Sequence, residues 1–295
     1  ELHSPSNMHK SGLHVEKLES LIAECIGTFF YTLMVSLTML HEDLQGGAVA
    51  IGVALASLTY AFGHISEAHF NPAVTLGVCL TGKMQWALGI LYIVVQLLGA
   101  CMGAVTSFIL AGSDVTQTAH PTNASGAPLV AAWVLECLFT LAIVLVYLNV
   151  ATEKNSSEPN SYYGIAIGFT VLAGVSAGFP LNVSVYNPAV NTAMGFLAGI
   201  TGRNTGMDSI WVYWTAPIVG TVAAALLKVF MNSDWHTQDT ARGRLPSVVP
   251  VVEFIGTFYL TLVYALNGSS LGVGGILLAM VYMGDHVCGV DFNPA

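Results

Sequence analysis

The sequence His69-Phe70-Asn71-Pro72-Ala73-Val74 has a counterpart in the second half of the chain, Val185-Tyr186-Asn187-Pro188-Ala189-Val190. Proline is well tolerated at the first position of a helix, and an asparagine just before it can cap the helix with its side-chain oxygen. Each Asn-Pro-Ala triplet therefore predicts a helix start. Both triplets lie between apolar segments long enough to span a bilayer, where a lipid-exposed loop could not satisfy its backbone polar groups. Two polar turns placed in this way predict a pore.

The asparagine side chains have a further use at such a site. Once the side-chain oxygen caps a helix, the NH2 group is free to donate a hydrogen bond to whatever lies ahead of it. If the two short helices enter from opposite membrane faces and meet at their N-termini, their dipoles place positive potential at the midplane. This arrangement repels a cation or hydronium and passes a neutral solute that carries hydroxyl groups.

The composition is that of a polytopic membrane protein, with 54% hydrophobic and 8% charged residues in 295. The formal charge of -9 is spread among loops and forms no tract that would indicate a nucleic-acid partner. We found no metal-ligand spacing, nucleophile motif or phosphate-binding glycine loop. The sequence therefore predicts that the protein is not an enzyme and that it holds no metal or cofactor.

Six apolar segments approach the roughly 20 residues that a helix needs to cross about 30 Å of hydrocarbon. They are Leu18–Leu40, Gly46–Ile65, Gln85–Ala111, Pro128–Val150, Tyr162–Phe179 and Ile210–Met231. Half-helices over about Pro72–Leu80 and Pro188–Gly199 are too short to span and suit only a buried lining. Glu24 precedes Asn71 by 47 positions and Glu136 precedes Asn187 by 51, which indicates two halves in inverted repeat.

Three stretches of the first half resemble the aquaporin (major intrinsic protein) family, at the spacing of that family: Ala23-Glu24-Cys25-Ile26-Gly27-Thr28-Phe29-Phe30, Gly63-His64-Ile65-Ser66 and Ala68-His69-Phe70-Asn71-Pro72-Ala73-Val74-Thr75. The resemblance covers residues 18–232. It implies an all-α membrane protein with six transmembrane helices and two re-entrant half-helices. It also implies a homo-oligomer in the lipid bilayer, either a tetramer of channel units or a dimer of tandem chains.

The resemblance assigns supporting roles to four residues. Glu24 and Glu136 are expected to accept hydrogen bonds from the irregular backbone near the half-helices, although an ionisable group inside a span is also a candidate proton relay. His69 is expected to present its ring to the pore, and His64 to brace the loop.

Members of the family have a second constriction near the outer mouth of the pore. The resemblance assigns it, by spacing to the two triplets, to Ile51, Val175, Ser184 and Val190. Most relatives have arginine where this chain has Val190. Three aliphatic side chains and one hydroxyl offer few hydrogen bonds, so a passing water loses partners at about 1–3 kcal/mol per unsatisfied group. We therefore expect slower water flow and an uncharged, wider mouth. Asn191, where glycerol facilitators usually have Asp, argues against a glycerol specialist.

The tail repeats the start of the chain. Val252-Glu253-Phe254-Ile255-Gly256-Thr257-Phe258 resembles the segment around Glu24, and His286 precedes Asn293 by seven positions, as His64 precedes Asn71. The sequence thus predicts a polar cytoplasmic segment 1–17, a channel unit 18–232, a cytoplasmic linker 233–246 and a partial second unit 247–295, as in a tandem protein. The alternative is a degenerate hairpin, about Ser247–Leu266 and Leu271–Cys288, that packs beside the channel.

The basic residues predict the orientation, because cytoplasmic loops are enriched in Lys and Arg. A cytoplasmic N-terminus leaves only Arg203 outside and places the other seven inside: Lys10, Lys17, Lys83, Lys154, Lys228, Arg242 and Arg244.

The function expected from these features is a passive channel for water and small uncharged solutes that excludes ions and protons at the two Asn-Pro-Ala turns. The alternative is a closed, non-conducting subunit with a structural role in a membrane assembly. The ring of Ile51, Val175 and Val190 supports this alternative, because aliphatic constrictions can gate by dewetting.

Overall fold

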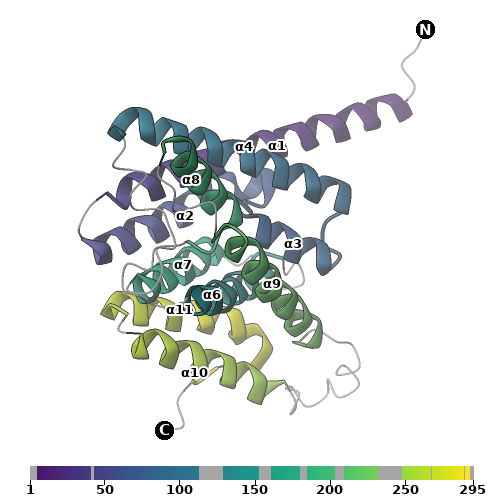
Figure 1. Cartoon of the computed structure of the whole chain (residues 1–295). Coiled ribbons are helices and arrows are strands. Elements are labelled where there is room, and N and C mark those ends of the chain that lie inside the picture. Colours follow the sequence, from purple (N-terminus) through teal and green to yellow (C-terminus); the bar gives the residue numbers. More distant parts are fainter. Residues whose placement is uncertain are drawn as a thin grey trace.

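The computed structural model describes residues 5–40, 43–112, 129–152, 161–179, 185–202, 209–231, 248–266, 268–288 and 290–292. These ranges form a helical bundle (Figure 1). Its helices are α1 (Pro5–Thr38), α2 (Leu44–Ser66), α3 (Pro72–Leu80), α4 (Trp86–Ala111), α6 (Leu129–Val150), α7 (Tyr163–Gly178), α8 (Pro188–Ile200), α9 (Val212–Met231), α10 (Val249–Ala265) and α11 (Ser270–Cys288).

Five helices of the described ranges are long and apolar enough to cross a membrane, namely α1, α2, α4, α6 and α9. The sequence predicted six, and the sixth, α7, has only 16 residues. It is nevertheless buried along most of its length, because α2 packs on it and α11 covers it as well. Nearer the N-terminus, α1 begins at Pro5 and so includes residues 5–17 of the segment that was expected to precede the first span.

The two halves of the chain pack in the same way, with the first long helix of each half lying along its last long helix. α1 lies along α4, and α6 lies along α9. A Cβ added to Gly99 of α4 would collide with the carbonyl oxygen of Cys25, and one added to Gly220 of α9 would collide with that of Cys137. Cys25 and Cys137 directly follow the two buried glutamates. Close helix crossings at small residues thus hold each half together.

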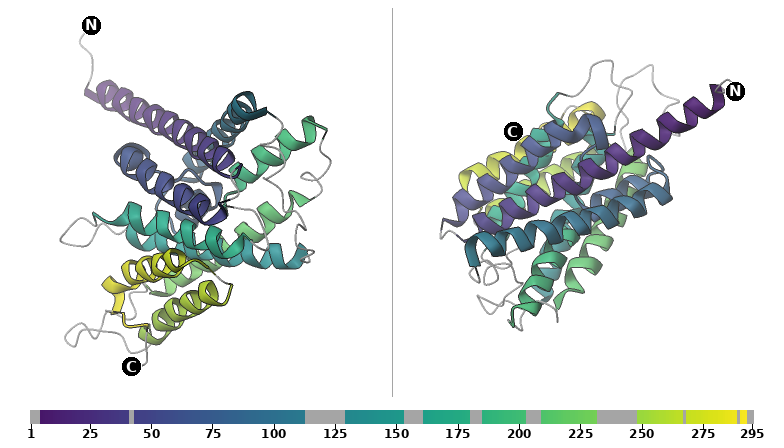
Figure 2. Two further views of the ribbon diagram at one scale, coloured as in Figure 1. Left: turned by 90° about the vertical axis from the view of Figure 1, so that its left-hand side faces the viewer. Right: turned by 90° about the horizontal axis from the view of Figure 1, so that it is seen from above.

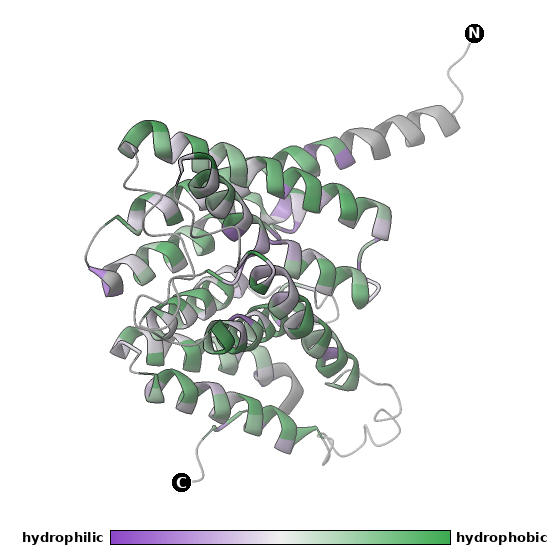
Figure 3. Ribbon diagram, in the orientation of Figure 1, coloured by the Kyte–Doolittle hydropathy of each residue, from purple (hydrophilic) through white to green (hydrophobic). Residues whose placement is uncertain are grey.

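The half-helices connect the halves, because each of them packs against helices of the other half. α3 contacts α9 and α6 as well as its own neighbour α4, while α8 contacts α4 as well as α9. Because each half-helix packs into the other half, the N-termini of α3 and α8 lie in the middle of the bundle. The outer faces of the helices are apolar (Figure 3), with exposed residues such as Ile90, Ile109 and Leu226. Both features suit a protein surrounded by lipid.

The C-terminal hairpin α10–α11 packs on the flank of the bundle formed by α6 and α7 (Figure 2). The Tyr259 hydroxyl donates a hydrogen bond to the Leu138 carbonyl at 2.6 Å, and the Ser269 N–H donates one to Ser176 Oγ at 3.0 Å. The hairpin is therefore part of the bundle. The proposed linker 233–246 and the third triplet, Asn293-Pro294-Ala295, lie outside the described residues.

One of the basic residues counted for orientation proves not to belong to a loop. Lys228 is buried in the last turn of α9, where its Nζ donates a hydrogen bond to Asn149 Oδ1 at 3.0 Å. Lys17 and Lys83 are exposed. Lys154, Arg203, Arg242 and Arg244 lie outside the described residues.

We expect Gly99→Ala and Gly220→Ala each to lower stability by about 1–3 kcal/mol, because the added methyl group forces a helix pair apart. The matched control is Gly274→Ala, where a Cβ meets nothing within 4 Å. The measurement is the midpoint of thermal unfolding in detergent. Equal midpoints for the three variants would contradict the packing described.

Candidate functional site

The two Asn-Pro-Ala turns start helices as the sequence predicts. Asn71 caps α3, with its Oδ1 accepting a hydrogen bond from the Ala73 N–H at 2.9 Å. Asn187 caps α8, with its Oδ1 accepting from the Ala189 N–H at 3.1 Å. Pro72 and Pro188 occupy the first turns of these helices, where the missing N–H is not needed.

Each asparagine also reaches across to the other half. Asn71 Nδ2 donates a hydrogen bond to the Tyr186 carbonyl at 3.0 Å, and Asn187 Nδ2 donates one to the Phe70 carbonyl at 2.7 Å. The sequence suggested that both NH2 groups are free to bind a solute. In the structure, each of them already donates one hydrogen bond to the opposite half. Because an amide carries two N–H donors, each asparagine keeps a second one for a further partner.

The backbone that leads into α3 is strained. Glu67, Ala68 and Phe70 have positive φ angles of 67°, 53° and 48°, and Tyr186 in the second half has 56°. For residues other than glycine this conformation costs about 1–3 kcal/mol each and needs support from its surroundings. The turn also leaves backbone N–H groups without helical or strand partners, so other acceptors must bind them.

Glu24 supplies these acceptors for the first turn. Its Oε1 accepts from the His69 N–H at 2.9 Å and from the Ser66 hydroxyl at 2.8 Å, and its Oε2 accepts from the Phe70 N–H at 2.8 Å and from Gln96 Nε2 at 2.7 Å. The carboxylate is fully buried on α1. Through these bonds it links the turn to both α1 and α4.

His69 lies beside this network with its ring fully buried. Its Nδ1 is 3.0 Å from Thr75 Oγ1, and the rings of Tyr92 and Tyr147 meet it edge-on at centroid distances of 5.3 Å. Its Nε2 has no hydrogen-bond partner among the described residues and lies 3.9 Å from a carboxylate oxygen of Glu67. His69 also lines the cavity at the asparagines that is described below.

The other two supporting residues have different surroundings. Glu136 is fully buried on α6, in the place that Glu24 occupies on α1. His64 is exposed on the last turn of α2. The expectation that His64 braces the loop stays a prediction.

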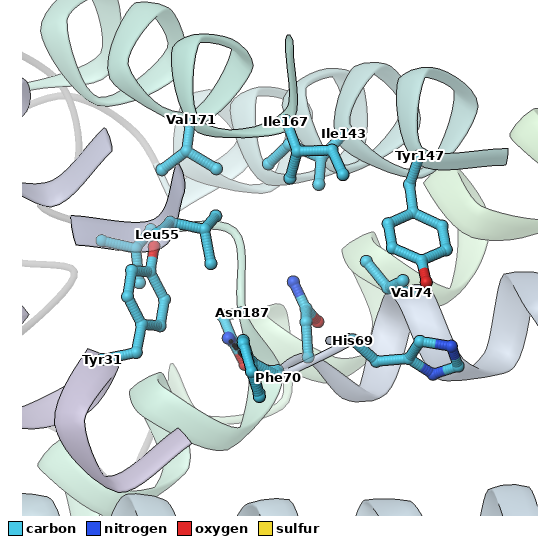
Figure 4. Close-up of a pocket in the computed structure, with 12 residues that line it drawn as sticks. Tyr31, Leu55, His69, Phe70, Val74, Ile143, Tyr147, Ile167, Val171 and Asn187 are labelled. Carbon is cyan, nitrogen blue, oxygen red and sulfur yellow. Dashed lines mark hydrogen bonds between the residues drawn. The ribbon is translucent and has the colours of Figure 1, made fainter. Parts of the chain in front are cut away.

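A narrow cavity lies at the crossing of the half-helices (Figure 4). Its volume is about 10 Å³, close to the minimum that holds one water. In the view of Figure 4, Tyr31 and His69 lie at opposite ends, with Asn187 and Phe70 between them. Both asparagines line the cavity, and its remaining wall is largely aliphatic. The Tyr31 hydroxyl is buried without a hydrogen-bond partner among the described residues.

Sequence reasoning missed the cavity residues that come from the long helices, although the repeat contains a signal for them. Tyr31 and Ile143 each stand seven positions after the glutamate of their half. Leu55 and Val171 each stand 16 positions before the asparagine of their half. Residues that occupy equivalent positions in both halves of an inverted repeat face the same axis, so aligning the halves would have found them.

The residues that the family resemblance assigns to the outer constriction do not, where the structure describes them, line this cavity. Ile51, Val175 and Val190 are fully or almost fully buried and do not line the cavity at the asparagines. Ser184 lies outside the described residues. Among the described residues, no group of three or more His, Cys, Asp or Glu side chains is placed to hold a metal ion.

Half-helices that meet at capped N-termini, around a narrow cavity in an apolar bundle, define a membrane channel. The family model for the major intrinsic protein matches residues 12–230 and ends before α10. The chain therefore belongs to the major intrinsic protein family, whose members are channels and not enzymes.

Relatives agree with this assignment. The chain is 32% identical to nodulin-26 of Glycine max, with 70% of this chain and 76% of that protein covered. It is 31% identical to glycerol uptake facilitator protein-like 6 of Lactiplantibacillus plantarum, with 74% and 100% covered. Among solved structures, the aquaglyceroporin of Plasmodium falciparum matches with a TM-score of 0.62 at 23% identity, over 72% of this chain and 95% of that one.

We expect Glu24→Gln to lower both the thermal midpoint and water permeability. Glutamine has one acceptor oxygen for four donors, and each buried group left unpaired costs about 1–3 kcal/mol. The matched control is Glu253→Gln, which alters the corresponding contacts in the C-terminal hairpin and should leave permeability unchanged. Wild-type permeability in Glu24→Gln would show that the turn does not need the carboxylate.

Proposed function

We propose that this protein is a passive channel for water and small neutral solutes, and that the route passes between Asn71 and Asn187. The observation that carries the proposal is the cavity between the two capping asparagines, where each side chain keeps one N–H donor for a passing solute. A solute with lone pairs can exchange its hydrogen bonds for these donors. Glycerol is a candidate, because one relative is named as a glycerol uptake facilitator.

Exclusion of ions follows from the same geometry. The N-termini of α3 and α8 both face the crossing, so the partial positive charges of two helix ends add there. Among the described residues, those that line the cavity include no carboxylate that would offset these charges. A cation would lose its hydration and gain no counter-charge, whereas a neutral solute is not repelled.

Selectivity at the outer mouth is proposed to rest on Ile51, Val175, Ser184 and Val190. Support comes from their spacing to the two triplets and from the burial of the three aliphatic residues. With Val190 in place of arginine, the mouth lacks a charged donor. We therefore expect water to pass more slowly than through a mouth with arginine, and less polar solutes to pass more easily.

A closed, structural subunit is the second candidate. It is supported by the small volume of the cavity, about 10 Å³, and by its largely aliphatic wall. A pore this narrow conducts only if the side chains move apart slightly. Flux measurements separate the two candidates.

The C-terminal hairpin is proposed to be a second copy of the N-terminal hairpin α1–α2. Glu253 accepts hydrogen bonds from the Asp291 and Phe292 N–H groups at 2.9 and 2.8 Å, as Glu24 does from His69 and Phe70. Phe292 has φ 48°, the same value as Phe70. These contacts support a repeat of the first hairpin within this chain. We propose, from the family resemblance, that the protein assembles as a tetramer of channel units or as a dimer of tandem chains. We also propose that the N-terminus lies on the cytoplasmic side of the membrane, as the distribution of Lys and Arg in the sequence predicts.

We expect Leu55→Trp to abolish most water flux, because an indole would fill the cavity that Leu55 lines. The control is Val94→Trp, at an exposed apolar position of α4. The measurement is stopped-flow shrinking of proteoliposomes under a sucrose gradient. Flux no higher than in empty liposomes for the folded wild-type protein would favour the structural subunit.

We expect Val190→Trp to reduce the flux of glycerol and urea as well as that of water, because it narrows the proposed outer mouth. Swelling of the same proteoliposomes in isotonic glycerol or urea measures this. If all three fluxes equal those of the wild type, Val190 is not in the path.

A further inference from the structure

Three buried aromatic rings connect the C-terminal hairpin to the turn that precedes α8. The ring of Tyr259 on α10 lies 6.3 Å from that of Phe139 on α6, and the Phe139 ring lies 5.1 Å from that of Tyr186. Both distances fall within the roughly 4.5–7 Å over which aromatic pairs attract each other. The three residues are at most 2% exposed, and Tyr186 directly precedes Asn187. A packed path thus leads from the hairpin to the crossing of the half-helices.

Tyr186 depends on its surroundings for its conformation. Its φ of 56° is unfavourable for a residue other than glycine and persists only where contacts on several sides fix it. Its hydroxyl donates a hydrogen bond to the Gly174 carbonyl at 2.6 Å, and its own carbonyl accepts one from Asn71 Nδ2 at 3.0 Å. A Cβ added to Gly174 would collide with the rings of both Tyr186 and Phe139, so these groups are in close contact. Movement of Phe139 or of α7 would therefore displace the carbonyl that Asn71 binds.

A second contact joins the hairpin to the last turn of α7. The Ser269 N–H donates a hydrogen bond to Ser176 Oγ at 3.0 Å, and Ser176 Oγ donates one to Gln45 Oε1 of α2 at 2.7 Å. Ser176 is fully buried and stands two residues after Gly174. Because Gly174 provides the acceptor for the Tyr186 hydroxyl, the hairpin contacts both helices that hold this tyrosine, α6 and α7.

We propose that Tyr259 and Ser269 of the C-terminal hairpin are positioning residues for the pore. By holding α6 and the end of α7, they keep Tyr186 where its carbonyl binds Asn71, so that the asparagine presents its remaining N–H to the route. Displacement of the hairpin loosens this turn and lowers permeation, which makes the hairpin a regulator of the channel unit on which it packs. The inference rests on the proposed route between Asn71 and Asn187 and adds its regulation.

The first measurement is the stopped-flow water permeability of proteoliposomes, divided by the amount of folded protein. Tyr259→Ala removes the ring that contacts Phe139, and we expect it to lower permeability at least about twofold, the lower limit for changes along a chain of packed side chains. Tyr259→Phe keeps the ring and should restore most of the wild-type value. The matched control is Tyr264→Ala, on the same helix but 76% exposed, which should equal the wild type.

Further variants separate the two contacts. Because Phe139→Leu interrupts the aromatic path, Tyr259→Ala should have little additional effect in that background, whereas independent sites would give additive losses. Ser176→Ala removes the acceptor of the second contact and should also lower permeability. Its control is Gln45→Ala, which loses only the bond to α2 and should equal the wild type.

The second measurement reports on the turn without conduction. In protein that carries isotope-labelled asparagine, the NMR signal of the Asn71 side-chain amide is assigned by its loss in Asn71→Ser. The chemical shift of this signal should change in Tyr259→Ala and stay in place in Tyr264→Ala, because the hydrogen bond to the Tyr186 carbonyl depends on the hairpin.

The outcomes are distinct. An Asn71 signal that does not move in Tyr259→Ala or Ser176→Ala, with folded protein shown by the unfolding midpoint, overturns the positioning role. A signal that moves while permeability stays constant overturns the regulation, and additive losses with Phe139→Leu overturn the aromatic path. If the wild type conducts no more than empty liposomes, the proposed function fails, and the Asn71 signal still decides the positioning role. Tyr259→Leu replaces Tyr259→Ala if the latter does not fold.

Discussion

The structure depends on one buried carboxylate and the backbone N–H groups that it binds. A turn that interrupts helices inside a bilayer has no water to satisfy its polar groups. Glu24 accepts hydrogen bonds from two backbone groups and two side chains and stabilises left-handed residues that would otherwise be too strained to persist. The carboxylate thus holds the turn that leads into α3, whose start at Pro72 is capped by Asn71 and whose N-terminus points at the centre of the molecule.

Much of this architecture could be predicted from local signals. The start of α3 at Pro72 and of α8 at Pro188 follows from capping chemistry, and the spans follow from apolar length. The length of α7 did not follow, because a helix covered by protein on both sides need not match the bilayer thickness. The extension of α1 to Pro5 was also missed, since a helix can continue into polar sequence without a change in pattern.

The site was predictable where its chemistry is local and not where it depends on helix rotation. Asn71 and Asn187 lie where the triplets placed them, but their bonds to Tyr186 and Phe70 of the opposite half required the fold. Tyr31 and Leu55 line the cavity because of the way α1 and α2 are turned, which composition does not show. His64 is exposed on the last turn of α2, and the loop-bracing role that the resemblance gives it stays a prediction.

The crossed asparagine bonds also bear on how the chain is made. The Phe70 carbonyl receives its hydrogen bond from a residue 117 positions later. At about 5–20 residues per second, the ribosome needs roughly ten seconds to supply that donor. Among the described residues, by contrast, all hydrogen-bond partners of Glu24 lie before residue 97. Glu253 binds the Asp291 and Phe292 N–H groups of the C-terminal hairpin in the same way. The newly inserted first half can therefore hold its turn in shape while it waits for the second.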